Sequence, residues 1–156
     1  MTFHLNIGSN LGDRRQWLDR AVQALRTTFP GAPISVSDII ETPAWGYESD
    51  HPYLNIGMTL ELPSGTDIAD TFARIRATEA TLSTHPHRDC AGGYADRPVD
   101  IDLIAADDIT TDTPVLTLPH PRMHLREFVL RPMAQLAPEW VHPHLGLTAE
   151  QMLLNL

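Results

Sequence analysis

The stretch YLNIGMTLEL, from Tyr53 to Leu62, alternates apolar and polar side chains without a break. A period of two is typical of a β-strand with one buried face and one polar face. On the polar face, Asn55 lies two residues after the aromatic ring of Tyr53. An amide can read the edge of a heterocycle, and an aromatic ring can stack on its face. This face is therefore a candidate binding surface, with an ordinary solvent-facing strand or a bulge as the alternative.

Segments on both sides of this strand follow a regular order. Phe3 to Ile7 alternates like a strand, and the apolar stripe from about Asp13 to Thr28 predicts a helix. Ile34 to Thr42 is the second predicted strand. After the Tyr53–Leu62 strand, Thr66 is expected to cap a helix that runs to about Ser83. RPVDIDLI, from Arg97 to Ile104, is the fourth predicted strand.

This β-α-β-β-α-β order predicts an α+β, ferredoxin-like domain. Such a domain packs its helices on an antiparallel sheet, here in an α/β/α layering. A short strand near Leu116 and a helix from about Glu127 to Leu136 follow. With no internal repeat and no linker, residues 1–156 are expected to form a single domain.

Composition excludes several classes of function. The chain carries a formal net charge of −9, and its 11 cationic residues are all Arg. The charge argues against a nucleic-acid partner, and the absence of Lys excludes a P-loop lysine and Schiff-base chemistry. One cysteine, Cys90, excludes an internal disulfide. No apolar run approaches the roughly 18 residues that span a membrane, and no signal peptide is evident. We therefore expect a cytoplasmic protein without a membrane partner, and a monomer.

Two aspartates interrupt the fourth predicted strand. Asp100 and Asp102 are two residues apart and so share one strand face, although Asp is among the poorest strand formers. Two converging carboxylates suit Mg²⁺, which takes one or two carboxylates and completes its shell with water and substrate phosphates. The alternative is an exposed edge strand with a charged face.

Two further places break the local pattern. Glu79 falls on the apolar stripe of the second helix, where a carboxylate must be paired or used, unless it reaches solvent near the helix end. The segment LPHPRMHLREF, Leu118 to Phe128, holds His120 and Arg126 and can position phosphate oxygens. For any single histidine here, packing or surface exposure is the alternative.

Together these motifs resemble the 6-hydroxymethyl-7,8-dihydropterin pyrophosphokinase family. The resemblance runs over nearly the whole chain in order: IGSNLGD, ETPAWG, PYLN, the helix with Glu79, RPVDIDLI, LTLPHPRM and REFVLRPM. Members of that family transfer pyrophosphate from ATP to the hydroxymethyl group of the pterin in folate biosynthesis, release AMP, and use two Mg²⁺ ions.

The resemblance implies a role for each unusual residue. Asp100 and Asp102 match the pair that binds both magnesium ions, and with Arg97 they form the expected catalytic set. The residues that match the pterin site are Thr42, Pro43, Ala44, Trp45, Gly46, Tyr53, Asn55 and Phe128. The residues that match the ATP site are Glu79, Arg88, Arg97, Leu103, Thr117, His120 and Arg126.

Departures from the family pattern concentrate at the ATP site. Gly93 stands where a basic residue is usual, and Asp96 stands where Pro or a small residue precedes the arginine. Val115 and Pro121 replace an arginine and a tyrosine that often contact ATP, and Arg88 is the only candidate for the usual loop arginines. Two alternatives therefore stay open: a diverged, non-catalytic paralogue that binds pterin or nucleotide, and a metal-dependent nucleotidyltransferase.

Overall fold

Two long central strands organise the sheet in the computed structural model. β1 (Thr2–Ser9) pairs antiparallel with β4 (Tyr53–Glu61) on one side and with β5 (Asp100–Ala106) on the other. β2 (Ile34–Val36) and β3 (Ile40–Thr42) both pair antiparallel with the outer edge of β4. The strand order is β2-β4-β1-β5, with β3 beside β4.

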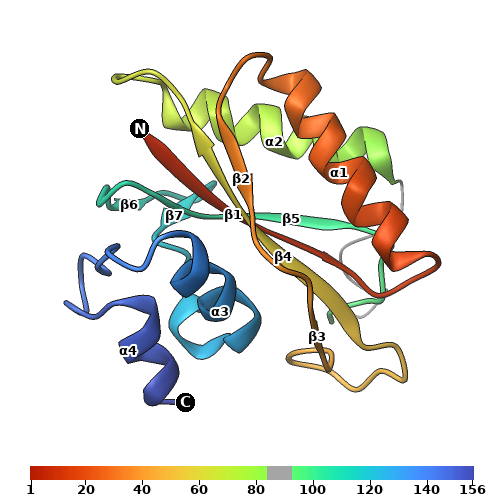
Figure 1. Cartoon of the computed structure of the whole chain (residues 1–156). Coiled ribbons are helices and arrows are strands. Elements are labelled where there is room, and N and C mark those ends of the chain that lie inside the picture. Colours follow the sequence, from red (N-terminus) through yellow and green to blue (C-terminus); the bar gives the residue numbers. More distant parts are fainter. Residues whose placement is uncertain (84–92) are drawn as a thin grey trace.

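Helices cover both faces of this sheet (Figure 1). α1 (Arg14–Thr28) and α2 (Ile68–Leu82) lie on one face, and α3 (Glu127–Leu136) and α4 (Ala149–Leu154) lie on the other. The expected α+β fold with antiparallel sheet and α/β/α layering is confirmed. A small hairpin, β6 (Thr111–Asp112) and β7 (Thr117–Leu118), and a 3₁₀ turn, η1 (Met123–Leu125), connect β5 to α3.

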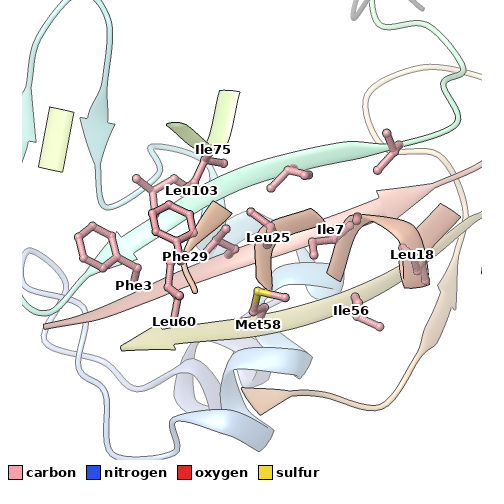
Figure 2. Close-up of a cluster of buried hydrophobic side chains, with 14 of the residues drawn as sticks. Phe3, Ile7, Leu18, Leu25, Phe29, Ile56, Met58, Leu60, Ile75 and Leu103 are labelled. Atoms are coloured by element: carbon pink, nitrogen blue, oxygen red, sulfur yellow. The ribbon is translucent and has the colours of Figure 1, made fainter. Parts of the chain in front are cut away.

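The period-two pattern of the strands separates two environments. Apolar side chains of β1, β4 and β5 point toward α1 and α2, where Ile7, Met58 and Leu103 meet Leu25 and Ile75 in a closed core (Figure 2). A smaller core lies on the other face, where Ile104 packs with residues of α3 and α4. This second core covers only part of that face of the sheet. Within the part of the chain that the structure describes, no helix covers the polar residues near the start of β5, Asp100 and Asp102, which line a cavity.

The second predicted strand, Ile34 to Thr42, is wrong as one continuous strand. Val36 pairs with Met58, and Ile40 pairs with Asn55. The chain therefore advances by four residues between β2 and β3 while β4 advances by three. The extra residue forms a bulge, and Ser37 fills the gap because its hydroxyl accepts a hydrogen bond from the Gly57 amide at 2.8 Å.

The predicted cap of the second helix is displaced by one residue. Asp67, not Thr66, is the N-cap, and its carboxylate accepts from the Asp70 amide at 2.9 Å. Thr66 instead closes the preceding turn by donating its hydroxyl to the Pro63 carbonyl. An ionised carboxylate is the better acceptor at a helix N-terminus, which explains the choice.

The structure describes residues 1–83 and 93–156. Arg88 and Cys90 lie outside these residues. Within them, no helix has the length and apolar character needed to cross a membrane.

Candidate active site

A cavity of about 230 Å³ opens on the polar face of β1, β4 and β5. Its walls come from the sheet, from the loop after β3, from the segment before β5, and from the η1–α3 region. The lining residues are Asn6, Gly8, Thr42, Pro43, Trp45, Tyr47, Tyr53, Asn55, Arg76, Tyr94, Arg97, Asp100, Asp102, His120, Arg126 and Phe128.

Strand register brings the two ends of the cavity together. Gly8 in the middle strand is paired with Asn55 on β4 and with Asp100 on β5. Because neighbouring strands lie about 4.8 Å apart, the backbones of Asn55 and Asp100 are roughly 10 Å apart, with one glycine between them. Gly8 has to be small here, since a Cβ at this position would come within 2.8 Å of the Asn55 side-chain oxygen.

The acidic end of the cavity is held by two arginines. Arg97 contacts the Asp100 carboxylate at 2.8 Å, and Arg126 lies 3.7 Å from Asp102. Burial raises the pKa of Asp100 well above its usual value, and the neighbouring charges of Asp102 and Glu79 add to this effect while Arg97 opposes it. A further cation beside these carboxylates, in addition to the two arginines, would stabilise their charged forms, as a bound metal ion does.

Glu79 lies behind this acidic pair rather than in the cavity. Its side chain is buried, and it accepts a 2.6 Å hydrogen bond from the Ile101 amide between the two aspartates. Arg76, one turn earlier on α2, contacts the same carboxylate at 3.1 Å and lines the cavity. The expectation that a core-facing Glu79 must be paired is confirmed, and the pairing ties α2 to the start of β5.

The opposite end of the cavity presents an oriented amide. Asn55 donates its side-chain NH₂ to the Thr42 hydroxyl at 3.0 Å, and its oxygen accepts from Asn6 at 3.3 Å. These two contacts orient the Asn55 amide. The side-chain oxygen of Asn6 is buried and has no hydrogen-bond partner among the residues that the structure describes. Buried acceptors of this kind are rare, and a bound molecule with an N–H donor would satisfy this one.

Aromatic rings and one guanidinium form the side wall. The Arg126 guanidinium carbon lies 4.6 Å from the Trp45 ring centre and 5.6 Å from that of Phe128. Both distances fall within the range of cation–π contacts, so the planar cation rests on two rings that also line the cavity. A flat ligand finds the same surfaces there.

His120 lies between the acidic pair and the 3₁₀ turn. Its Nδ1 accepts a hydrogen bond from the Arg122 amide at 3.1 Å, so Nε2 is the nitrogen that carries the proton in the neutral ring. Burial lowers the pKa of His120, the charge of Asp102 opposes this, and the charge of Arg126 reinforces it. A neutral imidazole at the cavity is thus a hydrogen-bond donor.

The structure gathers most of the predicted site residues around this one cavity and leaves others elsewhere. Ala44 and Gly46 belong to the loop after β3 but do not line the cavity. The Leu103 side chain is buried in the core on the opposite face of the sheet. Thr117 lies on β7 and lines a different hollow. Arg88 is outside the described residues.

Five lining residues were missed in the sequence. Asn6 and Gly8 alternate with the apolar residues of the first strand, so the period-two argument applied to Asn55 selects them too. Tyr94 stands where the family often has an aromatic Trp, but no periodicity marks Tyr47, Arg76 or Tyr94, because loop and helix-surface positions become neighbours of the site only through folding.

Comparisons with known proteins agree on one family. Residues 4–138 match the family model described as 7,8-dihydro-6-hydroxymethylpterin-pyrophosphokinase. A 2-amino-4-hydroxy-6-hydroxymethyldihydropteridine pyrophosphokinase of Porphyromonas gingivalis is 38% identical over 141 residues, which cover 90% of this chain and 92% of the relative. An enzyme of the same name from Mycobacterium leprae is 37% identical, covering 82% and 68%. The folic acid synthesis protein fol1 of Schizosaccharomyces pombe is 29% identical, covering 90% of this chain and 18% of that longer protein.

Proposed function

This chain belongs to the 7,8-dihydro-6-hydroxymethylpterin-pyrophosphokinase family, and on that premise we propose how its cavity performs the family reaction. The protein is an ATP-dependent transferase of folate biosynthesis. It moves pyrophosphate from ATP to the hydroxymethyl group of 6-hydroxymethyl-7,8-dihydropterin, and AMP leaves. Neither a non-catalytic paralogue nor a nucleotidyltransferase is favoured by any described feature of the site.

Asn55 carries the proposal for the pterin end. Its amide is held by Thr42 and Asn6, so the donor and acceptor positions that remain free for a ligand are oriented before the ligand binds. A pterin edge offers adjacent donors and acceptors that such an amide can match. Tyr53 and Phe128 supply the surfaces on which the bicyclic ring stacks, and Pro43 and Trp45 close the edge of the pocket.

Asp100 and Asp102 would hold Mg²⁺ at the other end. Among the residues that the structure describes, no group of three His, Cys, Asp or Glu side chains converges to hold a metal ion. Two carboxylates whose charges oppose each other fit a cation that takes its remaining ligands from water and phosphate. When bound, two Mg²⁺ ions would neutralise the triphosphate and increase the acidity of the attacking hydroxyl.

The reaction is a single displacement at the β-phosphorus. The pterin hydroxyl oxygen forms a bond to that phosphorus, and the bond to the oxygen bridging the α- and β-phosphates breaks, so AMP departs with that oxygen. The hydroxyl proton is released to solvent. Because catalysis of this kind is mostly positioning and charge neutralisation, the placement of Asn55 and Asp100 on strands two apart, with backbones roughly 10 Å from each other, sets the ring at one end and the phosphates at the other.

Two arginines and a neutral histidine around Asp100 and Asp102 position the phosphates. Arg97 and Arg126 each contact one of the two aspartates, and His120 is a neutral donor beside them. Arg76, which is not among the predicted site residues, lines the cavity and adds a positive charge beside Glu79, behind the acidic pair. We therefore assign Arg76 to the phosphate-binding set.

An AMP-release assay with 6-hydroxymethyl-7,8-dihydropterin, ATP and Mg²⁺ tests the function. We expect turnover by the wild type and none by Asp100→Asn or Asp102→Asn, while the Kd of the pterin measured by calorimetry stays within about threefold. Turnover by either variant near the wild-type rate would contradict the assigned metal site. Absence of turnover by the wild type would contradict the function itself.

The protein is further proposed to act as a cytoplasmic monomer without a nucleic-acid partner. Its net charge of −9 opposes association with a phosphate backbone. Light scattering of the purified protein measures the oligomeric state directly.

A further inference from the structure

Asp96 joins three parts of the chain that are distant in the sequence. One of its carboxylate oxygens accepts hydrogen bonds from the side chains of Asn10 at 2.8 Å, Tyr47 at 2.9 Å and Ser49 at 2.8 Å. Asn10 follows β1, the other two donors belong to the loop between β3 and β4, and Asp96 itself precedes β5. Its side chain is only about a quarter exposed, at 26%.

The chemistry of this junction requires a carboxylate. An ionised carboxylate accepts but does not donate, so three donors can converge on one oxygen without a mismatch. Desolvation opposes the charge of Asp96, but the hydrogen bonds from Ser49, Tyr47 and Asn10 outweigh it and lower the pKa. Asp96 is therefore charged at neutral pH.

From Asp96 the network continues into the cavity. The Tyr47 hydroxyl donates to Asp96 and lies 3.2 Å from the Tyr53 hydroxyl, so Tyr53 is the donor in that contact. The Tyr47 ring also stacks on Tyr94, with ring centres 6.3 Å apart and planes inclined by 27°. All three tyrosines line the cavity. Asp96 thus orients the tyrosines of the cavity wall although its own carboxylate does not line the cavity.

A second branch reaches the phosphate end. The side-chain oxygen of Asn10 accepts from the Arg97 amide at 2.9 Å, and the Asn10 amide donates to the Arg97 carbonyl at 3.2 Å. Arg97 in turn contacts Asp100. The same junction therefore adjoins both halves of the site. The loop between β3 and β4 meets the segment before β5 through the hydrogen bonds of Tyr47 and Ser49 to Asp96 and through the stacking of Tyr47 on Tyr94.

We propose that Asp96 is a positioning residue that docks the loop of residues 43–52 against the segment before β5 and thereby fixes the Tyr53 surface on which the substrate ring stacks. The identity of that ring as a dihydropterin rests on the proposed function. Asp96, which stands where the family pattern has Pro or a small residue, then acts together with Tyr47.

Three variants test the pair: Asp96→Asn, Tyr47→Phe, and the two combined. Asp50→Asn, an exposed carboxylate in the same loop, is the matched control. We expect each single variant to raise the Kd and the KM for the pterin about tenfold, with kcat at saturation within about twofold, because the ring surface is misplaced while the reacting groups are kept. The double variant should resemble the single variants, since Asp96→Asn weakens and Tyr47→Phe removes the same hydrogen bond.

Hydrogen–deuterium exchange of the 43–52 loop, measured without any substrate, provides a readout independent of activity. Exchange should accelerate in Asp96→Asn and Tyr47→Phe and stay unchanged in Asp50→Asn. An unchanged pterin Kd in Asp96→Asn and Tyr47→Phe would overturn the proposal. So would an equal loss of pterin and ATP-analogue binding together with a lowered unfolding midpoint in both, which marks a general structural role. If the wild type fails to turn over pterin, the proposed function fails, while the exchange result still decides whether Asp96 docks the loop.

Discussion

Gly8→Ala isolates the geometry of the pterin end by adding one methyl group. Gly8 lies inside β1 with ordinary strand backbone, so alanine meets no conformational strain there. The new Cβ would lie 2.8 Å from the Asn55 side-chain oxygen and 3.2 Å from a ring carbon of Tyr53. Ordinary contact requires the amide to withdraw by about half an ångström or more.

This displacement has two energetic consequences. Weakening the contacts of Asn55 to Thr42 and Asn6 costs about 1 kcal/mol each in unfolding free energy, and replacing glycine by alanine in a strand returns about 0.5–1 kcal/mol. Global stability should therefore fall by only about 1 kcal/mol. Pterin affinity should fall further, by about 10- to 30-fold, because an amide shifted by this distance no longer meets the ring edge.

Calorimetry with the pterin and with an ATP analogue separates these effects. The Kd of the analogue should change by less than about threefold, since the nearest atoms to the added methyl belong to Asn55 and Tyr53. In an Asn55→Ala background, Gly8→Ala should have no further effect on pterin affinity. Wild-type pterin affinity in Gly8→Ala alone would refute the assigned role of Asn55.

Three further variants test the supporting structure. Gly57→Ala should lower the free energy of unfolding by about 2 kcal/mol in urea denaturation, because its Cβ would lie 2.5 Å from the Pro132 Cβ and separate α3 from the sheet; unchanged stability would show that α3 adjusts freely. Glu79→Ala should cost about 2 kcal/mol in the same assay, because the Ile101 amide loses its buried acceptor, and Glu79→Gln should cost less; equal losses would contradict this reason. Burial lowers the pKa of His4 to about 4, so the unfolded chain binds a proton there between about pH 6.5 and pH 4 that the folded chain does not. Unfolding free energy should therefore fall by up to about 3 kcal/mol more in the wild type than in His4→Gln as the pH drops through that window, and parallel pH profiles would exclude the effect.

Hydrophobic periodicity accounts for what the sequence predicts well. The alternation in Tyr53–Leu62 and Phe3–Ile7 predicts which face of each strand carries the apolar core, and the structure agrees, although most of the polar positions of both strands are buried as well. The same pattern does not predict the bulge at Ser37. There the Ser37 hydroxyl takes the place of one backbone acceptor between the two strands, and the spacing of the apolar residues along the sequence hardly changes.

The site was predictable where a residue conflicts with its own strand or helix. Asp100, Asp102 and Asn55 are polar residues inside strands, and Glu79 is a charge on an apolar stripe. Asp96 carries no such signal, since a polar residue in a loop breaks no local rule. In the sequence it is only a departure from a family pattern, and its partners become visible when the chain is folded.

The position of β1 between β4 and β5 also has a consequence for how the protein folds. Gly8 pairs with Asn55 and with Asp100, so each half of the site forms by closing a long chain segment onto the first strand. The β1–β4 contact closes the shorter segment at the lower entropic cost, and the β1–β5 contact, which joins Gly8 to Asp100, closes the longer one. During synthesis the strand pair that carries Asn55 and Tyr53 is therefore able to form first, whereas the acidic half and Phe128 are added only after β5 and α3 have emerged from the ribosome.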